Sequence, residues 1–316
     1  MKYINTLQEN TRISSVYLCR SKSTHLTKTG KEYESLTLQD RTGTADAKIW
    51  DPGNPGIGDF DAPDYVAVDA DVQVFNGNIQ LIIRRIRRAE PGEYAPEDYL
   101  PVSERSREVM FQELKAAVAS VKDPFYAEVL KKVFFTDVEF TKRFCARSAA
   151  KSVHHSFVGG LLEHTLSVTK LCDYYCSAYP ILNRDLLITA ALCHDIGKVQ
   201  ELSAFPENEY TDEGQLLGHI VMGSEMLAKI ISEIPDYPPR KAAELRHCIL
   251  AHHGEYEFGS PKKPALMEAM ALNMADNTDA KMEIFKELLT NAGTAGNNGW
   301  LGFQRFLDSN VRRASE

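Results

Sequence analysis

The residues of this chain best suited to chemistry are a histidine and an aspartate that are adjacent in an apolar segment. His194 and Asp195 follow the run Leu186–Leu192 and precede an Ile-Gly-Lys sequence that ends at Lys198. Burying a carboxylate beside an imidazole is costly unless each group is paired or bound to a cation. The pair therefore predicts a divalent metal site and makes the chain a candidate hydrolase.

Further histidines and aspartates that could ligate a metal are spaced through the same part of the chain. In order, the candidate ligands are His164, His194, Asp195, His219, His252 and Asp276. Imidazole and carboxylate without cysteine favour an ion such as manganese or iron over structural zinc. His253 has more than one candidate role, because it could contact the scissile phosphate, protonate a leaving group or ligate metal in place of His252.

Composition and charge set limits on the function. The chain has 316 residues, which suits two domains, and a net charge of −8. Residues 1–90 are electrically balanced, so the acidic excess lies in residues 91–316. This charge argues against indiscriminate coating of nucleic acid. The six cysteines form no C-x-x-C pair, which favours buried free thiols over disulfides or a zinc knuckle.

The chain shows no targeting or membrane signal. Its first residues lack the apolar segment of a signal peptide, and no apolar run reaches 18 residues. We therefore expect a cytoplasmic protein with no membrane partner. A homo-oligomer is compatible with this sequence.

The elements of residues 1–90 read as strands. Apolar residues alternate over Val66–Phe75, Asn76-Gly77 marks a hairpin, and a return strand follows through Ile83. An earlier strand pair spans Leu36–Ile49, and a first strand covers Arg12–Cys19. Five strands within about 80 residues are typical of a small Greek-key barrel.

The later elements read as helices. Residues 91–104, punctuated by Pro91, Pro96 and Pro101, are predicted to be a linker. Beyond them the apolar period becomes 3.6, which predicts helices. The expected ranges are Arg105–Ser120, Pro124–Phe134, Asp137–Arg147, Ser156–Ala178, Arg184–Leu202, Gly214–Ile234, Arg240–His252 and Pro264–Thr290.

Two resemblances define the predicted fold class. Leu36–Trp50 resembles the LxLxDxTGxxxAxxW segment of anticodon-binding OB-folds, and the H…HD…H…H…D order resembles the HD superfamily of metal-dependent phosphohydrolases. They imply a multidomain α+β protein with an N-terminal five-stranded OB-fold β-barrel and an all-α HD domain. The expected boundaries are 1–90 for the barrel, 91–104 for the linker and 105–316 for the HD domain.

The HD resemblance implies two divalent ions. One would be held by His164, His194, Asp195 and Asp276, and Asp195 would bridge to a second ion held with His219 and His252. Such a pair can activate water and stabilise the attacking and leaving oxygens at phosphorus. Lys198 would act as a point-charge clamp on the phosphate. Mn²⁺ is the favoured metal, while Fe²⁺, Co²⁺, Ni²⁺, Mg²⁺ and Zn²⁺ are compatible with these ligands.

The predicted substrate contacts lie in both halves. OB barrels bind single strands by base stacking and phosphate contacts, so the candidate nucleic-acid contacts are Lys48, Trp50, Phe75, Arg84 and Arg85. In the helical half, His155 and Lys281 flank the ligand-bearing segments and are candidate substrate contacts.

The combination of halves narrows the resemblance. The sequence HHSFVGGLLEHT at residues 154–165 and the tail Trp300–Leu307 resemble bacterial YhaM-type 3′-to-5′ exoribonucleases. This resemblance implies metal-dependent removal of 3′-terminal nucleotides from single-stranded RNA, or DNA, as nucleoside monophosphates. One alternative is an HD phosphohydrolase acting on a small nucleotide or cyclic dinucleotide. A second is a non-catalytic nucleic-acid-binding regulator.

Overall fold

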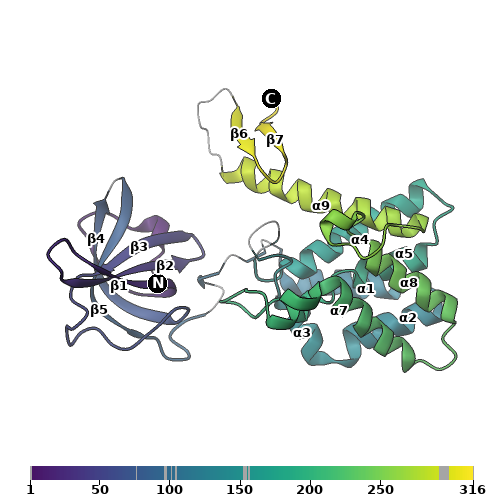
Figure 1. Cartoon of the computed structure of the whole chain (residues 1–316), viewed down its shortest axis with the longest axis horizontal. Coiled ribbons are helices and arrows are strands. Elements are labelled where there is room, and N and C mark those ends of the chain that lie inside the picture. The colour runs from purple at the N-terminus through teal and green to yellow at the C-terminus, as the bar shows by residue number, and fades with distance from the viewer. Residues whose placement is uncertain are drawn as a thin grey trace. The chain divides into compact units, whose positions relative to one another are not determined.

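The chain forms two compact units, Met1–Val102 with Phe205–Glu207 and Ser103–Ala204 with Asn208–Glu316 (Figure 1). The computed structural model describes residues 2–75, 77–95, 98–100, 102–103, 105–151, 155, 157–291 and 299–315. Asn76 of the expected hairpin and Pro96 and Pro101 of the expected linker lie outside these ranges. Among the described residues, no helix is long and apolar enough to cross a membrane.

The first unit is a closed five-stranded barrel of strand order β1-β2-β3-β5-β4. All neighbouring strands are antiparallel except the parallel pair β3 and β5. The strands are β1 (Arg12–Leu26), β2 (Glu32–Asp40), β3 (Gly43–Ile49), β4 (Tyr65–Phe75) and β5 (Asn78–Arg88), preceded by the 3₁₀ turn η1 (Ile4–Thr6). This topology confirms the predicted OB-fold.

The alternation of apolar residues in β4 fills the barrel. Alternate β4 residues from Val66 to Val72 are buried, whereas Val74, beside the hairpin, is 43% exposed. A register shift between Asp69 and Ala70 interrupts the pairing with β5. Such a bulge changes which side chains face the core. Ile83 and Ile86 are consequently both buried, and Arg84 and Arg85 between them are exposed.

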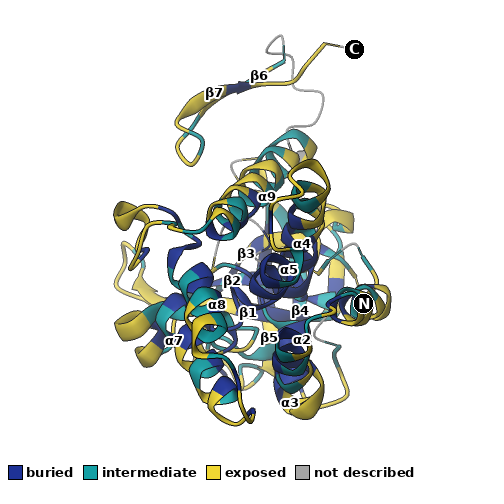
Figure 2. Ribbon diagram, turned by 90° about the vertical axis from the view of Figure 1, so that its right-hand side faces the viewer, coloured by how far each residue is buried: buried dark blue, intermediate teal, exposed yellow. Residues whose placement is uncertain are grey.

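The second unit is helical, with α5 at its centre (Figure 2). Every residue of α5 from Leu186 to Cys193 is buried, as expected for a helix that is apolar on all sides. α5 packs against α2, α4, α8 and α9. The elements are α1 (Arg107–Ala119), α2 (Pro124–Lys131), the π-helical turn η3 (Lys132–Thr136), α3 (Val138–Ala146), α4 (Gly160–Ala178), α5 (Arg184–Cys193), α6 (Lys198–Glu201), α7 (Asp212–Ser232), α8 (Pro239–Ala251), the 3₁₀ turn η4 (Tyr256–Phe258), α9 (Met267–Asn291) and the hairpin β6 (Trp300–Gln304) and β7 (Ser309–Arg312).

The structure differs from three of the expected helices. The single helix expected over Arg184–Leu202 is wrong, because a turn at residues 194–197 separates α5 from α6. The helix expected from Ser156 begins only at Gly160, after Gly159 adopts a left-handed φ of 85°. α7 is interrupted at Gly218, where φ is 73° and ψ is 155°. Glycine adopts such angles without steric cost.

The turn between α5 and α6 depends on a close approach to α7 at Gly197. A Cβ added at Gly197 would lie 2.1 Å from the carbonyl oxygen of His219. On the facing helix, a Cβ at Gly223 would have its nearest neighbour at 3.5 Å, which is an ordinary contact. The two glycines therefore share one interface but differ in whether they tolerate a side chain.

We predict opposite effects for alanine at these two positions. Gly197→Ala should destabilise the helical unit by about 3 kcal/mol or more, because backbone must move to relieve the overlap. Gly223→Ala should be neutral or stabilising by up to about 1 kcal/mol, because alanine favours a helix over glycine. Urea unfolding followed by far-ultraviolet circular dichroism measures both. Equal midpoints for the two variants would contradict the packing described.

Candidate active site

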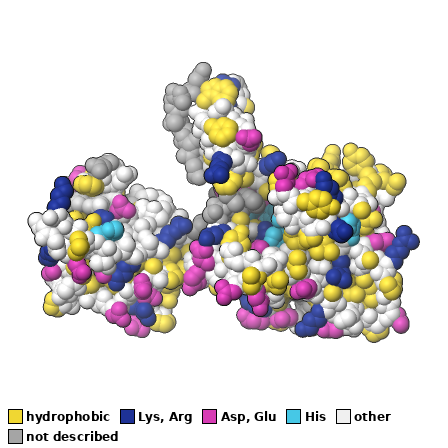
Figure 3. Space-filling view, in the orientation of Figure 1, with side chains coloured by type: hydrophobic (Ala, Val, Ile, Leu, Met, Phe, Trp, Pro, Cys, Tyr) yellow, Lys and Arg dark blue, Asp and Glu magenta, His cyan; other side chains and the backbone are white. Residues whose placement is uncertain are grey.

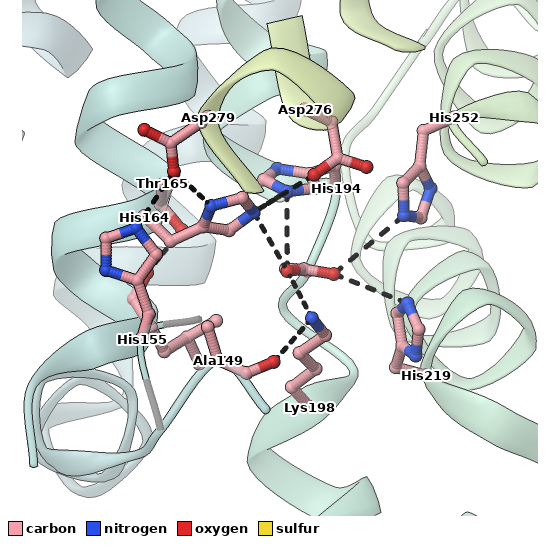
Figure 4. A network of polar contacts seen from close by, with 12 residues as sticks. Ala149, His155, His164, Thr165, His194, Lys198, His219, His252, Asp276 and Asp279 are labelled. Atoms are coloured by element: carbon pink, nitrogen blue, oxygen red, sulfur yellow. Dashed lines mark hydrogen bonds and ion pairs between the residues drawn. The ribbon is translucent and has the colours of Figure 1, made fainter. Parts of the chain in front are cut away.

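The six predicted metal ligands come from five separated elements and lie together in the helical unit (Figure 4). His164 is on α4, and His194 and Asp195 are in the turn that follows α5. His219 follows the interruption in α7. The remaining two are His252, which directly follows α8, and Asp276, which is on α9.

Asp195 lies at the centre of this cluster, with its side chain 2% exposed. Its Oδ2 atom is 3.5 Å from His164 Nε2 and 3.4 Å from His194 Nε2. Its Oδ1 atom is 3.4 Å from His219 Nε2 and 3.8 Å from His252 Nε2. The two oxygens of one carboxylate therefore face two different pairs of histidines.

Each side of Asp195 has a compact group of donor atoms. Ligand atoms of His164, His194 and Asp276 all lie within 4.8 Å of one another. The same is true of His219, His252 and His253. Asp276 Oδ1 is also 3.2 Å from His164 Nε2. These nitrogen and oxygen atoms are the donors that catalytic divalent metals prefer.

Backbone carbonyls fix the orientation of three histidine rings. The Nδ1 atoms of His194, His252 and His253 each lie 2.7–2.8 Å from a carbonyl oxygen. Because a carbonyl only accepts, Nδ1 must donate in each case. The neutral ring then carries its lone pair on Nε2. For His194 and His252 this is the atom that faces Asp195.

Carboxylates fix the orientation of the other two rings, His164 and His219. Asp279 Oδ2 is 2.7 Å from His164 Nδ1, and Glu201 Oε1 is 2.9 Å from His219 Nδ1. Glu201 Oε1 also accepts a hydrogen bond from the backbone N–H of His219, which the interruption at Gly218 makes available. Glu201 could not be predicted from the sequence, because its partner His219 lies on another helix.

Several buried atoms of the cluster lack a hydrogen-bond partner. Among the described residues, these include Asp195 Oδ1 and the Nε2 atoms of His219 and His252, whose contacts are the longer ion-pair distances given above. Buried polar atoms are normally hydrogen-bonded. Here, Asp195 Oδ1 and the Nε2 atoms of His219 and His252 face one another without an intervening donor. A divalent cation would satisfy all of them, so the residues present fit a metal.

The electrostatics keep the carboxylates charged and one key imidazole neutral. Burial raises the pKa of Asp195, but Lys198 and His194 outweigh it and hold that pKa well below its ordinary value. Burial and the neighbouring His253 hold the pKa of His252 well below its ordinary value. For His164, burial is outweighed by Asp276 and Asp279, which raise its pKa to about 9.

The other residues predicted to contact substrate in this unit differ in how close they lie to the metal-ligand cluster. Lys198 Nζ is 2.8 Å from Asp195 Oδ2 and donates a hydrogen bond of 2.6 Å to the carbonyl of Ala149. His155 is buried and bonded to Asp279. Lys281 is exposed on α9, and no contact among the described residues joins it to the cluster. His154 lies outside the described residues.

An aromatic row lies on the outside of the barrel. The rings of His25 and Tyr33 are stacked with centroids 5.4 Å apart, and those of Tyr33 and Trp50 are 5.0 Å apart. Lys48 Nζ is 5.7 Å from the Tyr33 centroid and donates to Ser35 Oγ at 2.6 Å. Trp50 is 46% exposed. Lys48 and Trp50 were predicted from the sequence, whereas Tyr33 and His25 were not, because their proximity depends on strand pairing.

The remaining barrel candidates are less well grouped. Phe75, at the end of β4, is 57% exposed. Arg84 forms an ion pair with Asp71. The neighbouring Arg87 and Arg88 are likewise paired, with Glu93 and Asp64. Among the described residues, Arg85 has no ion pair. Surface carboxylates therefore offset most of this basic cluster. Acidic and basic side chains are also interspersed on the face of the protein drawn in Figure 3.

Comparisons with known proteins cover both units. Residues 161–281 match the HD domain family model. The 3'-5' exoribonuclease YhaM of Geobacillus sp. (strain WCH70) is 33% identical over 86% of this chain and 83% of its own. The 3'-5' exoribonuclease YhaM of Bacillus subtilis (strain 168) is 33% identical over 88% of both. Among solved structures, the second OB-fold domain of replication protein A from Methanococcus maripaludis aligns with 29% of this chain and 96% of its own, at 17% identity and a TM-score of 0.22.

Proposed function

This chain belongs to the family of YhaM 3′-5′ exoribonucleases, and on that premise we propose that it removes 3′-terminal nucleotides from single-stranded RNA by metal-dependent hydrolysis. The observation that carries the proposal is the pair of Asp195 oxygens, each facing its own pair of histidine Nε2 atoms. The order of the ligands along the sequence does not by itself predict that the two oxygens face different histidines. Single-stranded DNA is a second substrate compatible with the same contacts.

The proposed ligands divide into two sets that share Asp195. The first set is His164, His194 and Asp276, and the second is His219 and His252, with the Nε2 atom of His253 available either as a further ligand or as a proton donor to the leaving oxygen. Two divalent ions held by these residues would supply Lewis acidity and an activated water at phosphorus. We favour Mn²⁺ because the donors combine imidazole nitrogen with carboxylate oxygen.

Lys198 is proposed to hold a phosphate oxygen. Burial lowers its pKa, but the adjacent Asp195 outweighs burial and raises it, so the ammonium stays charged. An ammonium has three N–H donors, and contacts with Asp195 and the Ala149 carbonyl account for two of them. The third would be free to stabilise charge that develops on the phosphate.

The aromatic row of His25, Tyr33 and Trp50 is proposed as the track for the strand. Aromatic side chains stack with any base, and a neighbouring cation contacts the phosphate backbone. Lys48 supplies such a cation, because its Nζ atom lies 5.7 Å from the centroid of the Tyr33 ring. The OB-fold face formed by β2 and β3 is the usual location of such contacts.

We predict that Asp195→Ala abolishes exonuclease activity, because both metal sets lose their shared ligand. The assay is shortening of 5′-labelled single-stranded RNA in the presence of Mn²⁺, which should produce a ladder with the wild type and none with the variant. Asp173→Ala is the matched control, because this aspartate forms a surface ion pair with Arg184 and is 52% exposed. Unchanged turnover by Asp195→Ala would contradict the assignment.

We also predict that Trp50→Ala weakens binding of long strands more than cleavage of a dinucleotide. Loss of one stacking contact is worth about 1–3 kcal/mol, so KM for a long RNA should rise roughly 5- to 150-fold. Lys48→Ala should weaken binding and reduce its dependence on salt. Tyr174→Ala, on α4 and 66% exposed, is the control aromatic. Equal effects on the long strand and the dinucleotide would show that the barrel has no substrate role.

A further inference from the structure

Asp279 is a buried carboxylate that the proposed ligand sets do not use. Its Oδ2 atom lies 2.7 Å from His164 Nδ1 and 2.9 Å from His155 Nε2. The side chain is 14% exposed, and that of His155 is 2% exposed. Burial raises the pKa of Asp279, but the hydrogen bonds to the two histidines outweigh burial and lower it. One carboxylate oxygen therefore joins two imidazoles (Figure 4).

Helix α9 contacts both edges of the His164 ring. Asp276 Oδ1 is 3.2 Å from Nε2, on the side of the ring that faces Asp195. Asp279, three residues later on the same helix, contacts Nδ1 on the opposite edge. Residues three apart lie on one face of a helix. The spacing of the two aspartates thus fits the width of the imidazole that they hold.

The position of His155 is built into the segment before α4. Its φ is 56°, in the left-handed region that residues other than glycine rarely adopt. A Cβ at Gly160 would lie 2.0 Å from the carbonyl oxygen of His155. The second glycine of the sequence HHSFVGGLLEHT is therefore required for His155 to reach Asp279. A strained residue held by its surroundings is a recognised indicator of function.

We infer that Asp279 is a positioning residue for His164, and that His155 is a positioning residue for Asp279. Asp279 keeps the proton of His164 on Nδ1, which presents the lone pair of Nε2 to the metal, and His155 fixes the carboxylate in place. Carboxylates behind metal-bound histidines fix the tautomer and ring orientation in this way. This inference rests on the proposed function, in which His164 is a metal ligand.

The observed distances favour hydrogen bonds over an additional metal ion at this group. His155, His164 and Asp279 offer ligand atoms within 4.8 Å of one another. However, the nitrogen–oxygen separations of 2.7 Å and 2.9 Å are those of N–H···O hydrogen bonds to a carboxylate. His155 is then directed at Asp279 and away from a role as a direct substrate contact.

The test measures Mn²⁺ affinity of the full-length protein without RNA, by competition with a fluorescent chelator after the metal has been stripped. Asp279→Asn should weaken Mn²⁺ binding about 10- to 100-fold, the usual effect of losing such a partner. His155→Phe should weaken it less, and His155→Gln, which restores a donor, should recover most of the loss. Asp173→Asn makes the same chemical change in a surface ion pair and should bind Mn²⁺ like the wild type.

Different Mn²⁺-binding results would overturn the inference or the proposed function. Wild-type Mn²⁺ affinity in Asp279→Asn would overturn the inference, as would a His155→Phe variant that raises KM for RNA while binding Mn²⁺ normally. If His164→Ala also binds Mn²⁺ like the wild type, the proposed function itself fails. If circular dichroism shows that Asp279→Asn does not fold, the comparison of His155→Phe with His155→Gln decides, because equal Mn²⁺ affinities in those two variants would overturn the inference.

Discussion

The Asp195 carboxylate is ionised in the interior of the helical unit, where its side chain is 2% exposed. Burying such a charge costs several kcal/mol unless partners compensate for it. Lys198 compensates on one oxygen, and histidines on both sides face the carboxylate. The fold positions this carboxylate. α5 is buried on all sides and ends at Cys193, and the turn that follows directs Asp195 toward the other ligand-bearing elements. A metal bound by these residues would therefore also stabilise the folded unit, because the ligands come together only when it is folded.

The orientation of the histidines extends the same constraint outward. Each ring contacts an acceptor through Nδ1, whether a backbone carbonyl or one of the carboxylates Glu201 and Asp279. These acceptors come from different segments, so the donor set is fixed only when the helices are packed together. Buried polar networks are stabilising when every member is satisfied. A metal would satisfy the members that the described residues leave without a hydrogen-bond partner.

The sequence predicted the parts of this site that local chemistry encodes. The order of histidines and aspartates pointed to six side chains that the structure brings together, and period-2 alternation predicted the barrel. The sequence did not predict the turn that separates α5 from α6. The need for glycine at position 197 comes from the carbonyl of His219, which packs against it from another helix. Glu201 was missed for the same reason, since its partner is on another helix. The basic cluster in β5 was visible in the sequence, but the carboxylates that pair with it lie elsewhere.

The central proposal is that Asp195 would be the ligand shared by two divalent ions. Anomalous X-ray scattering from crystals of the full-length protein grown with Mn²⁺ tests it directly. The account predicts two manganese peaks, one on each side of Asp195, with His164, His194 and Asp276 around the first and His219 and His252 around the second. A single peak, or peaks that do not contact Asp195, would contradict the two-metal site.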